Sequence, residues 1–294
     1  MKKFVIVSDS GCALDKNLRA EYDVEYIPMY VSYDGHSIPA DLDWEVVSPK
    51  EYYDTLRAGK RIFTSQVPVS AYLEQFEKYV KAGYDVLSIT CSSGLSASVK
   101  ASQVAREEIL GRYPEAKIFC VDALNSGFGE GILCVLASRL RAAGKTIEEI
   151  AATLDTMKMN VHQFGTVDDL KYLKMAGRIS AGKAMVGALL NVKPIIVSNR
   201  QGENVSAEKV KGRQNSIQMM AQRGAETYTG EWVEEIFIAH AECLEDAEKL
   251  QKCILERLPN VKTGIYQLDP ILSASCGPKT LAVHCVGGPK PDVH

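Results

Sequence analysis

Strand-like and helix-like segments alternate along the first half of this 294-residue chain, and this rhythm constrains its fold more than any other feature. Ser48-Pro49 followed by Glu51 predicts one helix start, and Thr146 with Glu149 predicts another. Short apolar runs between such helices are typical of a parallel sheet covered on both faces. The predicted strands are residues 4–8, 24–31, 86–90 and 117–121.

After about residue 160 the pattern changes. Residues 192–198 and 203–210 flank a turn-forming Asn199-Arg200-Gln201-Gly202 segment and predict a β-hairpin, and residues 181–190 predict a helix of small residues. A chain of this length is about twice a typical domain. We therefore predict an N-terminal parallel-sheet α/β domain at 1–162 and a C-terminal α+β domain at 163–294.

Composition excludes several classes of protein. The net charge of −3 gives no electrostatic reason to expect nucleic acid as a partner. No run reaches the roughly 18 apolar residues of a membrane span, and the apolar run at 4–7 is too short for a secretory signal. We expect a cytoplasmic protein. Its eight cysteines lack C-x-x-C spacing and are expected to be reduced core residues.

Ligands of parallel α/β sheets bind in loops at the carboxyl ends of the strands. Here those loops are rich in Ser, Thr, Asp and Gly, and the clearest example is residues 92–98, which follow a predicted strand. Two interpretations are open for this segment. Its backbone N–H groups and hydroxyls could bind a carboxylate or phosphate, or its serines could simply cap a helix.

Several catalytic and cofactor motifs are absent from the sequence. There is no phosphate loop, no G-x-G-x-x-G after the first strand, no G-x-S-x-G and no His/carboxylate cluster. We therefore predict no catalytic residue, no metal site and no cofactor. Asp9 is expected to brace a loop at a strand end. Arg178, beside Gly177, could pair with an anion, although alone it would be read as a surface residue.

Short polar and glycine-containing segments recur in order along the chain. They are Ser8-Asp9-Ser10, Thr64-Ser65-Gln66, Ser92-Ser93-Gly94-Leu95-Ser96, Asp122, Ser126-Gly127, Gly129, Gly131, residues 173–180 and Lys193-Pro194-Ile195. Taken together, these segments resemble the DegV family of fatty-acid-binding proteins, in family order and over nearly the whole chain. The resemblance implies that one long-chain fatty acid lies between the two domains. It also implies a partner, an ATP-dependent fatty acid kinase subunit that forms an acyl phosphate for phospholipid synthesis.

The resemblance also implies roles for individual residues. By position, Thr64 and Ser96, with Ser93 nearby, would hydrogen-bond the carboxylate, and Arg178 would approach the head group. Four further residues would support the site, namely Asp9, Ser10, Lys211 and Arg213.

Two positions depart from the family pattern. The histidine of the usual Thr-His-Thr-Gly-Pro-Gly segment falls on Ser275, and a usual arginine is Lys211. A serine can donate one hydrogen bond to the carboxylate but cannot become cationic. We expect these changes to affect phosphotransfer more than lipid binding.

A second functional class stays open on the residues alone. The same loops could serve an enzyme acting on a small carboxylated or phosphorylated substrate. A long apolar tunnel between the domains would favour the carrier, whereas an exposed polar cleft would favour the enzyme.

Overall fold

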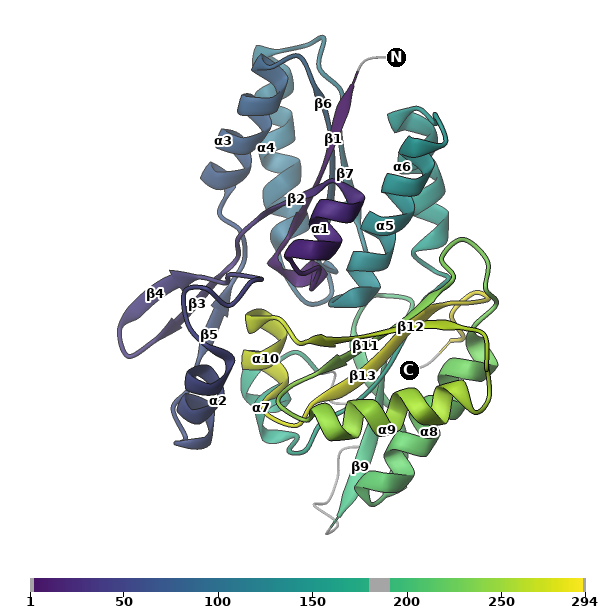
Figure 1. Cartoon of the computed structure of the whole chain (residues 1–294). Helices are drawn as coiled ribbons and strands as arrows, with labels where there is room; N and C mark the ends of the chain where they lie inside the picture. The colour runs from purple at the N-terminus through teal and green to yellow at the C-terminus, as the bar shows by residue number, and fades with distance from the viewer. Residues whose placement is uncertain (1–2, 180–190, 293–294) are drawn as a thin grey trace.

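The computed structural model describes residues 3–179 and 191–292 (Figure 1). Its N-terminal part contains a parallel sheet with strand order β2-β1-β6-β7. Helices α3 and α4 cover one face, and α1, α5 and α6 cover the other, which confirms the predicted α/β architecture. The strands are β1 (Phe4–Asp9), β2 (Val24–Ile27), β6 (Asp85–Thr90) and β7 (Ile118–Asp122). The helices are α1 (Lys16–Tyr22), α3 (Val69–Lys81), α4 (Ser98–Arg112), α5 (Phe128–Ala142) and α6 (Ile147–Met157).

A small antiparallel sheet and one helix project from this part as an arm, residues 30–65 (Figure 1). The single strand predicted at 24–31 is wrong, because the chain leaves the parallel sheet at Pro28 and Met29. Proline has no N–H for a ladder, and the N–H of Met29 donates to Ser10 Oγ instead (3.0 Å). The arm contains β3 (Tyr30–Tyr33), β4 (His36–Pro39), α2 (Pro49–Arg57) and β5 (Phe63–Ser65), with strand order β4-β3-β5.

The C-terminal part is built on a six-stranded mixed sheet with order β10-β9-β8-β13-β11-β12. Only β11 and β12 pair in parallel, and the hairpin predicted around residues 199–202 is confirmed as β9 and β10. The strands are β8 (Val161–Thr166), β9 (Val192–Ser198), β10 (Asn204–Lys211), β11 (Glu235–His240), β12 (Lys262–Gln267) and β13 (Leu281–Val286). The helix expected at 181–190 lies outside the described residues.

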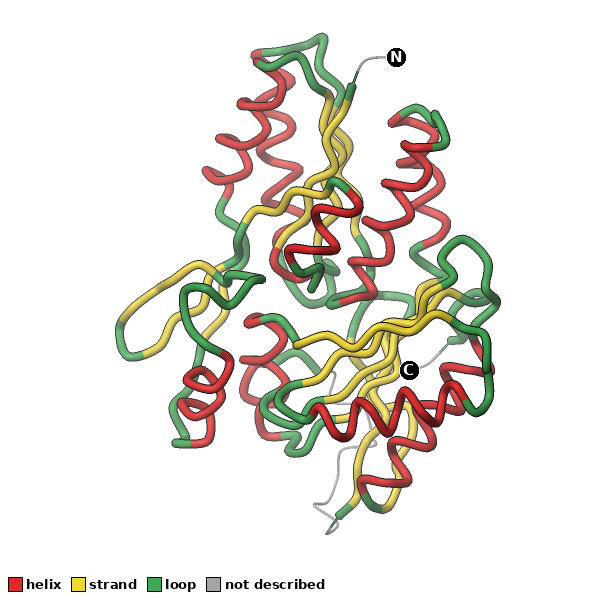
Figure 2. The backbone as a smooth tube through the Cα atoms, viewed as in Figure 1, coloured by secondary structure: helices red, strands yellow, loops and turns green. Residues whose placement is uncertain are grey.

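The two faces of this sheet have different neighbours. Residues such as Ile238 and Val283 pack into a core with α8 (Arg213–Thr227) and α9 (Leu244–Leu255). The other face lies toward the N-terminal part, where Phe128 of α5 stacks on Phe237 with ring centroids 5.0 Å apart. Figure 2 shows the sheet between these layers. Two short helices, α7 (Lys171–Ala176) and α10 (Pro270–Cys276), complete this part, and α10 was not predicted.

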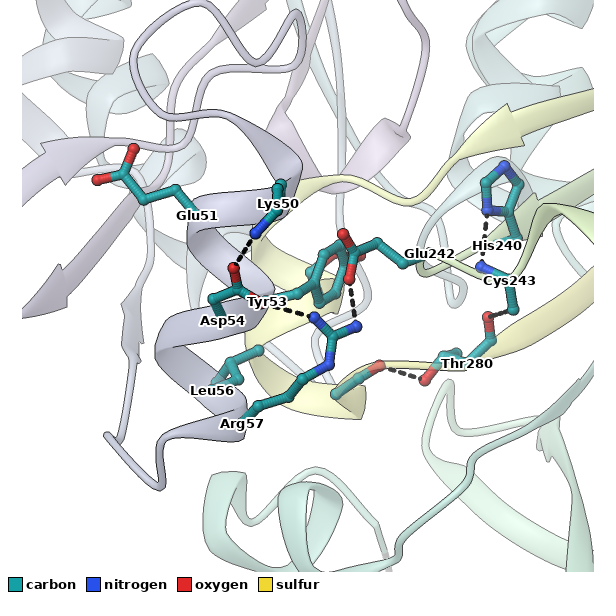
Figure 3. A network of polar contacts seen from close by, with 12 residues as sticks. Lys50, Glu51, Tyr53, Asp54, Leu56, Arg57, His240, Glu242, Cys243 and Thr280 are labelled. Carbon is teal, nitrogen blue, oxygen red and sulfur yellow. Dashed lines mark hydrogen bonds and ion pairs between the residues drawn. The ribbon is translucent and has the colours of Figure 1, made fainter.

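Helix α2 of the arm docks on α10. The hydroxyl of Tyr52 donates to the Pro270 carbonyl (2.7 Å), and Tyr53 Oη lies 2.6 Å from Ser273 Oγ. Figure 3 shows the exposed edge of this contact, where Arg57 pairs with Glu242 of the loop after β11. Among the described residues, no helix is both long and apolar enough to cross a membrane.

Candidate functional site

A cavity of about 1050 Å³ lies where the N-terminal strand ends, the arm, α7 and α10 meet. Its walls include the serine loop, defined here as residues 91–97 between β6 and α4. The structure brings five of the predicted ligand-binding residues to this one cavity, namely Thr64, Ser93, Ser96, Arg178 and Ser275. Parallel strand ends therefore converge on the site as the sequence pattern predicted.

Acidic side chains at the ends of the two strands that flank β6 fix the serine loop. Asp9, at the end of β1, accepts from the Cys91 N–H (3.1 Å), and Asp122, at the end of β7, accepts from the Ser93 N–H (3.1 Å). Helix α4 begins only at Ser98, so the loop is not itself the first helical turn. The N-cap residue of α4 is Ala97, and no side chain caps the helix, although Ser96 Oγ accepts from the Ser98 N–H (3.2 Å) just before it.

The arm brings Thr64 to the cavity on β5, where it pairs with Val31 of β3. Ser10 ties this arm to β1, because its hydroxyl donates to the Ala40 carbonyl (2.7 Å) and accepts from Met29. Asp9 also accepts from the Gly11 N–H (2.7 Å), so it braces the loop as expected. Asp9 and Ser10 thus hold the elements that line the cavity, and neither lines it directly.

Three buried carboxyl groups lie behind the cavity wall. Burial raises the pKa of Asp9 to about 6 and that of Asp269 to about 7. Burial, reinforced by the charge of Asp9, raises the pKa of Glu130 well above its ordinary value. Each shift favours the neutral acid over the carboxylate.

Arg178 links the C-terminal part to the serine loop. Helix α7 ends at Gly177 in the left-handed conformation (φ 65°), which turns the chain toward the loop. The Arg178 Nε then donates to the Leu95 carbonyl (3.0 Å), and its Nη1 donates to the Ala176 carbonyl (2.6 Å). The guanidinium is therefore positioned by two carbonyls while it remains exposed at the cavity.

Ser275 reaches the cavity from α10. Its Oγ donates to the Ile271 carbonyl one turn earlier (3.1 Å), so its proton is used within the helix. The two supporting residues predicted on the second domain lie elsewhere. Arg213, at the start of α8, pairs with Asp246 of α9 (2.8 Å), and Lys211 is the last residue of β10. Neither Arg213 nor Lys211 lines the cavity.

Sequence reasoning missed a second cation and most of the apolar wall. Lys100 and Gln103 line the cavity from α4, where their spacing of three places them on one side of the helix. Helix α10 could have been found from its capping Asp269 and its first-turn Pro270. The principal apolar residues of the wall are Met29, Leu95, Val99, Leu173, Ile271 and Leu272.

No group of three or more His, Cys, Asp or Glu side chains that could hold a metal ion occurs within residues 3–179 and 191–292. The arrangement is that of a two-part α/β fold, with a hydroxyl-lined cavity where the strand ends of the N-terminal part meet the arm, α7 and α10. The family model described as "Uncharacterised protein, DegV family" matches residues 3–287. The chain belongs to the DegV family.

Relatives and solved structures agree with this assignment. A DegV domain-containing protein of Clostridium perfringens is 37% identical over 290 residues, covering 99% of both chains. A stearic-acid-binding protein from Eubacterium ventriosum has a TM-score of 0.85 at 24% identity, covering 97% of this chain and 98% of its own. A fatty-acid-binding DegV family protein from Thermus thermophilus has a TM-score of 0.84 at 23% identity, covering 98% and 100%. These two likenesses show the shared two-part fold.

Proposed function

We propose that this protein binds one long-chain fatty acid between residues 1–162 and 163–294, and carries it without transforming it. The observation that supports this most directly is the composition of the cavity. Hydroxyls and two cations lie beside an apolar wall, which matches an amphipathic acid. The fatty-acid binding named for the relatives from Eubacterium ventriosum and Thermus thermophilus supports the same ligand class.

The carboxylate would be held by the serine loop and the arm. Thr64, Ser93 and Ser96 supply hydroxyl donors, and Arg178 and Lys100 supply positive charge. A buried or half-buried carboxylate needs such partners, because an unpaired one is costly to desolvate. The Ser275 hydroxyl would have to give up its hydrogen bond to the Ile271 carbonyl before it could donate to the ligand.

The acyl tail would lie along the apolar wall. Each buried methylene contributes about 0.8 kcal/mol before association costs, so affinity should rise with chain length. Because Ser93 and Arg178 are both exposed, the head group would lie near the surface. We propose that a separate ATP-dependent fatty acid kinase reaches it there.

Native mass spectrometry of the purified protein tests the ligand class. We expect a co-purified fatty acid, and uptake of palmitate or oleate by delipidated protein. Binding of acetate and inorganic phosphate is measured in parallel. Tight binding of these small anions without any fatty-acid binding would instead favour an enzyme with a small substrate.

The double variant Thr64→Ala/Ser96→Ala tests the head-group assignment. Loss of two hydrogen bonds to a charged group should weaken palmitate binding about 100-fold, or about 3 kcal/mol. The matched control is Ser37→Ala/Thr55→Ala, which removes one exposed and one half-buried hydroxyl from the arm, away from the cavity lining. Equal affinities in both double variants, measured by calorimetry, would overturn the assignment.

A further inference from the structure

The main cavity continues into a narrow inner chamber of about 50 Å³ beneath α10. The two spaces adjoin, because five residues line both of them. The other walls of the inner chamber come from β8, β9 and β13, on the sheet face that lies toward the N-terminal part. The shared residues are Ser126, Leu173, Asn204, Leu272 and Cys276.

His284 lines this inner chamber from β13. It pairs with Gln163 across the sheet, so the alternation of side chains places both on the chamber's face. The side chain of His284 is 3% exposed, and its ring centroid lies 6.1 Å from that of Phe128. A Cβ at Gly127 would lie 3.6 Å from His284 Nε2, so the absent side chain leaves room beside the ring.

Two polar neighbours of His284 have partners, whereas Thr166 Oγ1, which lines the same chamber, and His284 Nδ1 have none among the described residues. Gln163 Nε2 donates to Asn204 Oδ1 (2.7 Å), and Thr280 Oγ1 donates to the Gly277 carbonyl (2.8 Å). Within the part of the chain that the structure describes, the buried Nδ1 of His284 has no hydrogen-bond partner. An unsatisfied buried group of this kind points to a ligand that completes it.

The ring of His284 is suited to accept a hydrogen bond. Burial lowers its pKa to about 4, against a smaller opposing effect of the Phe237 backbone, so the imidazole is neutral at physiological pH. One nitrogen of a neutral imidazole is an acceptor. A methylene of an ordinary acyl chain cannot donate to it, but a hydroxyl can.

We propose that the acyl ligand carries a hydroxyl group on its chain, and that this hydroxyl donates a hydrogen bond to the imidazole of His284 in the inner chamber. The inference rests on the proposed function and narrows its ligand from fatty acids to hydroxylated fatty acids. The carboxylate stays with the serine loop, and the chain passes Leu272 to reach the chamber.

Competition binding in the full wild-type chain tests this ligand class. Delipidated protein is mixed with stearate and one hydroxystearate at a time, each isomer differing in hydroxyl position, and native mass spectrometry gives the ratio of the two bound acids from their different masses. We expect at least one isomer to bind about tenfold or more tightly than stearate. If every isomer binds as stearate does or more weakly, the inference is overturned while the proposed function stands.

The variant His284→Leu tests whether the imidazole ring of His284 causes the preference for a hydroxystearate over stearate. It should reduce the preferred isomer's advantage over stearate to within about threefold, and His284→Gln, which keeps an acceptor oxygen, should restore part of it. The control is the exposed His36→Leu, which should retain the full advantage. An advantage that survives in His284→Leu would overturn the role of His284. Failure of both stearate and all hydroxystearates to bind would overturn the proposed function itself.

Discussion

Two sets of contacts join the N-terminal and C-terminal parts on different sides of the cavity, and they differ in which wall of the cavity they hold. In the hairpin contact, residues 199–202 between β9 and β10 meet the serine loop, where Ser92 Oγ donates to the Gly202 carbonyl (2.7 Å). Ser92 is completely buried there. Ser198 Oγ and Lys290 Nζ both donate to the Leu124 carbonyl, each at 2.9 Å.

In the arm contact, α2 lies against α10. Tyr52 and Tyr53 bury their hydroxyls, but the ion pair between Arg57 and Glu242 is exposed to solvent (Figure 3). The hairpin contact holds the serine loop directly, whereas the arm contact holds Thr64 through a separate small sheet.

The largest expected effect comes from Gly202→Ala in the hairpin contact. A Cβ there would lie 2.0 Å from Ser92 Oγ and 2.9 Å from the Leu124 Cα, at a φ of +74°. We expect a loss of about 2–4 kcal/mol in the free energy of unfolding, measured by urea denaturation.

Gly59→Ala is the matched control for Gly202→Ala. Gly59 has a similar φ of +81°, but its Cβ would meet no atom within 4 Å. Only the backbone strain of about 1–2 kcal/mol should then remain. Equal losses in the two variants would show that the hairpin contact is not tightly packed.

Lys290→Met should produce a smaller effect that depends on pH. Burial lowers the pKa of Lys290 to about 7, so between pH 7 and 10.5 the unfolded chain binds a proton that the folded chain lacks. The free energy of unfolding of the wild type should therefore rise with pH in this window relative to the variant, by at most about 1.4 kcal/mol per unit. At pH 9 the lost hydrogen bonds should cost the variant about 2 kcal/mol.

Urea denaturation at pH 7, 8 and 9 measures this difference for Lys290→Met. The exposed Lys209→Met controls for the loss of a positive charge. A difference between wild type and Lys290→Met that stays constant from pH 7 to 9 would contradict the burial of this amine in the hairpin contact.

The contrast between the two contacts also separates what the sequence could reveal from what it could not. Ser48 and Thr146 do cap α2 and α6, because capping depends on residues within one turn. The bond between Ser92 and Gly202 joins residues 110 positions apart, and no local pattern records it. Lys290 near the C-terminus would be read as solvated, yet its side chain is buried between two loops.

The predicted site residues also divide into those that a local sequence pattern could place and those whose position depends on tertiary packing. Ser96 could be placed at the cavity because strand ends converge, whereas Thr64 was placed by the family resemblance and reaches the cavity on β5 of the arm. Lys211 and Arg213 lie outside it, because the path of β10 and the ion pair of Arg213 with Asp246 depend on the packing of α8 and α9. The arm was missed because its sheet begins where Pro28 interrupts an apparently continuous apolar run.

Tyr53→Phe tests the buried half of the arm contact. The hydroxyl contacts Ser273 Oγ at 2.6 Å and accepts from Gln267 Nε2 at 3.1 Å, so its loss should cost about 1–1.5 kcal/mol of unfolding free energy. Tyr72→Phe is the control, since the Tyr72 hydroxyl is buried without a hydrogen-bond partner among the described residues. It should change stability by less than about 0.5 kcal/mol. Equal costs would mean that the tyrosine hydroxyl does not stabilise the arm.

Arg57→Gln should have the smallest effect, because the Arg57 side chain is 45% exposed and water screens its pairs with Asp54 and Glu242. In low salt we expect the free energy of unfolding to fall by about 0.5 kcal/mol or less, which is typical of surface ion pairs. In about 0.5 M salt we expect no measurable loss. The measurement is urea denaturation at both salt concentrations, with Lys50→Gln as the control for an exposed pair within α2. A loss larger than that of Tyr53→Phe would show that the arm is held by charge.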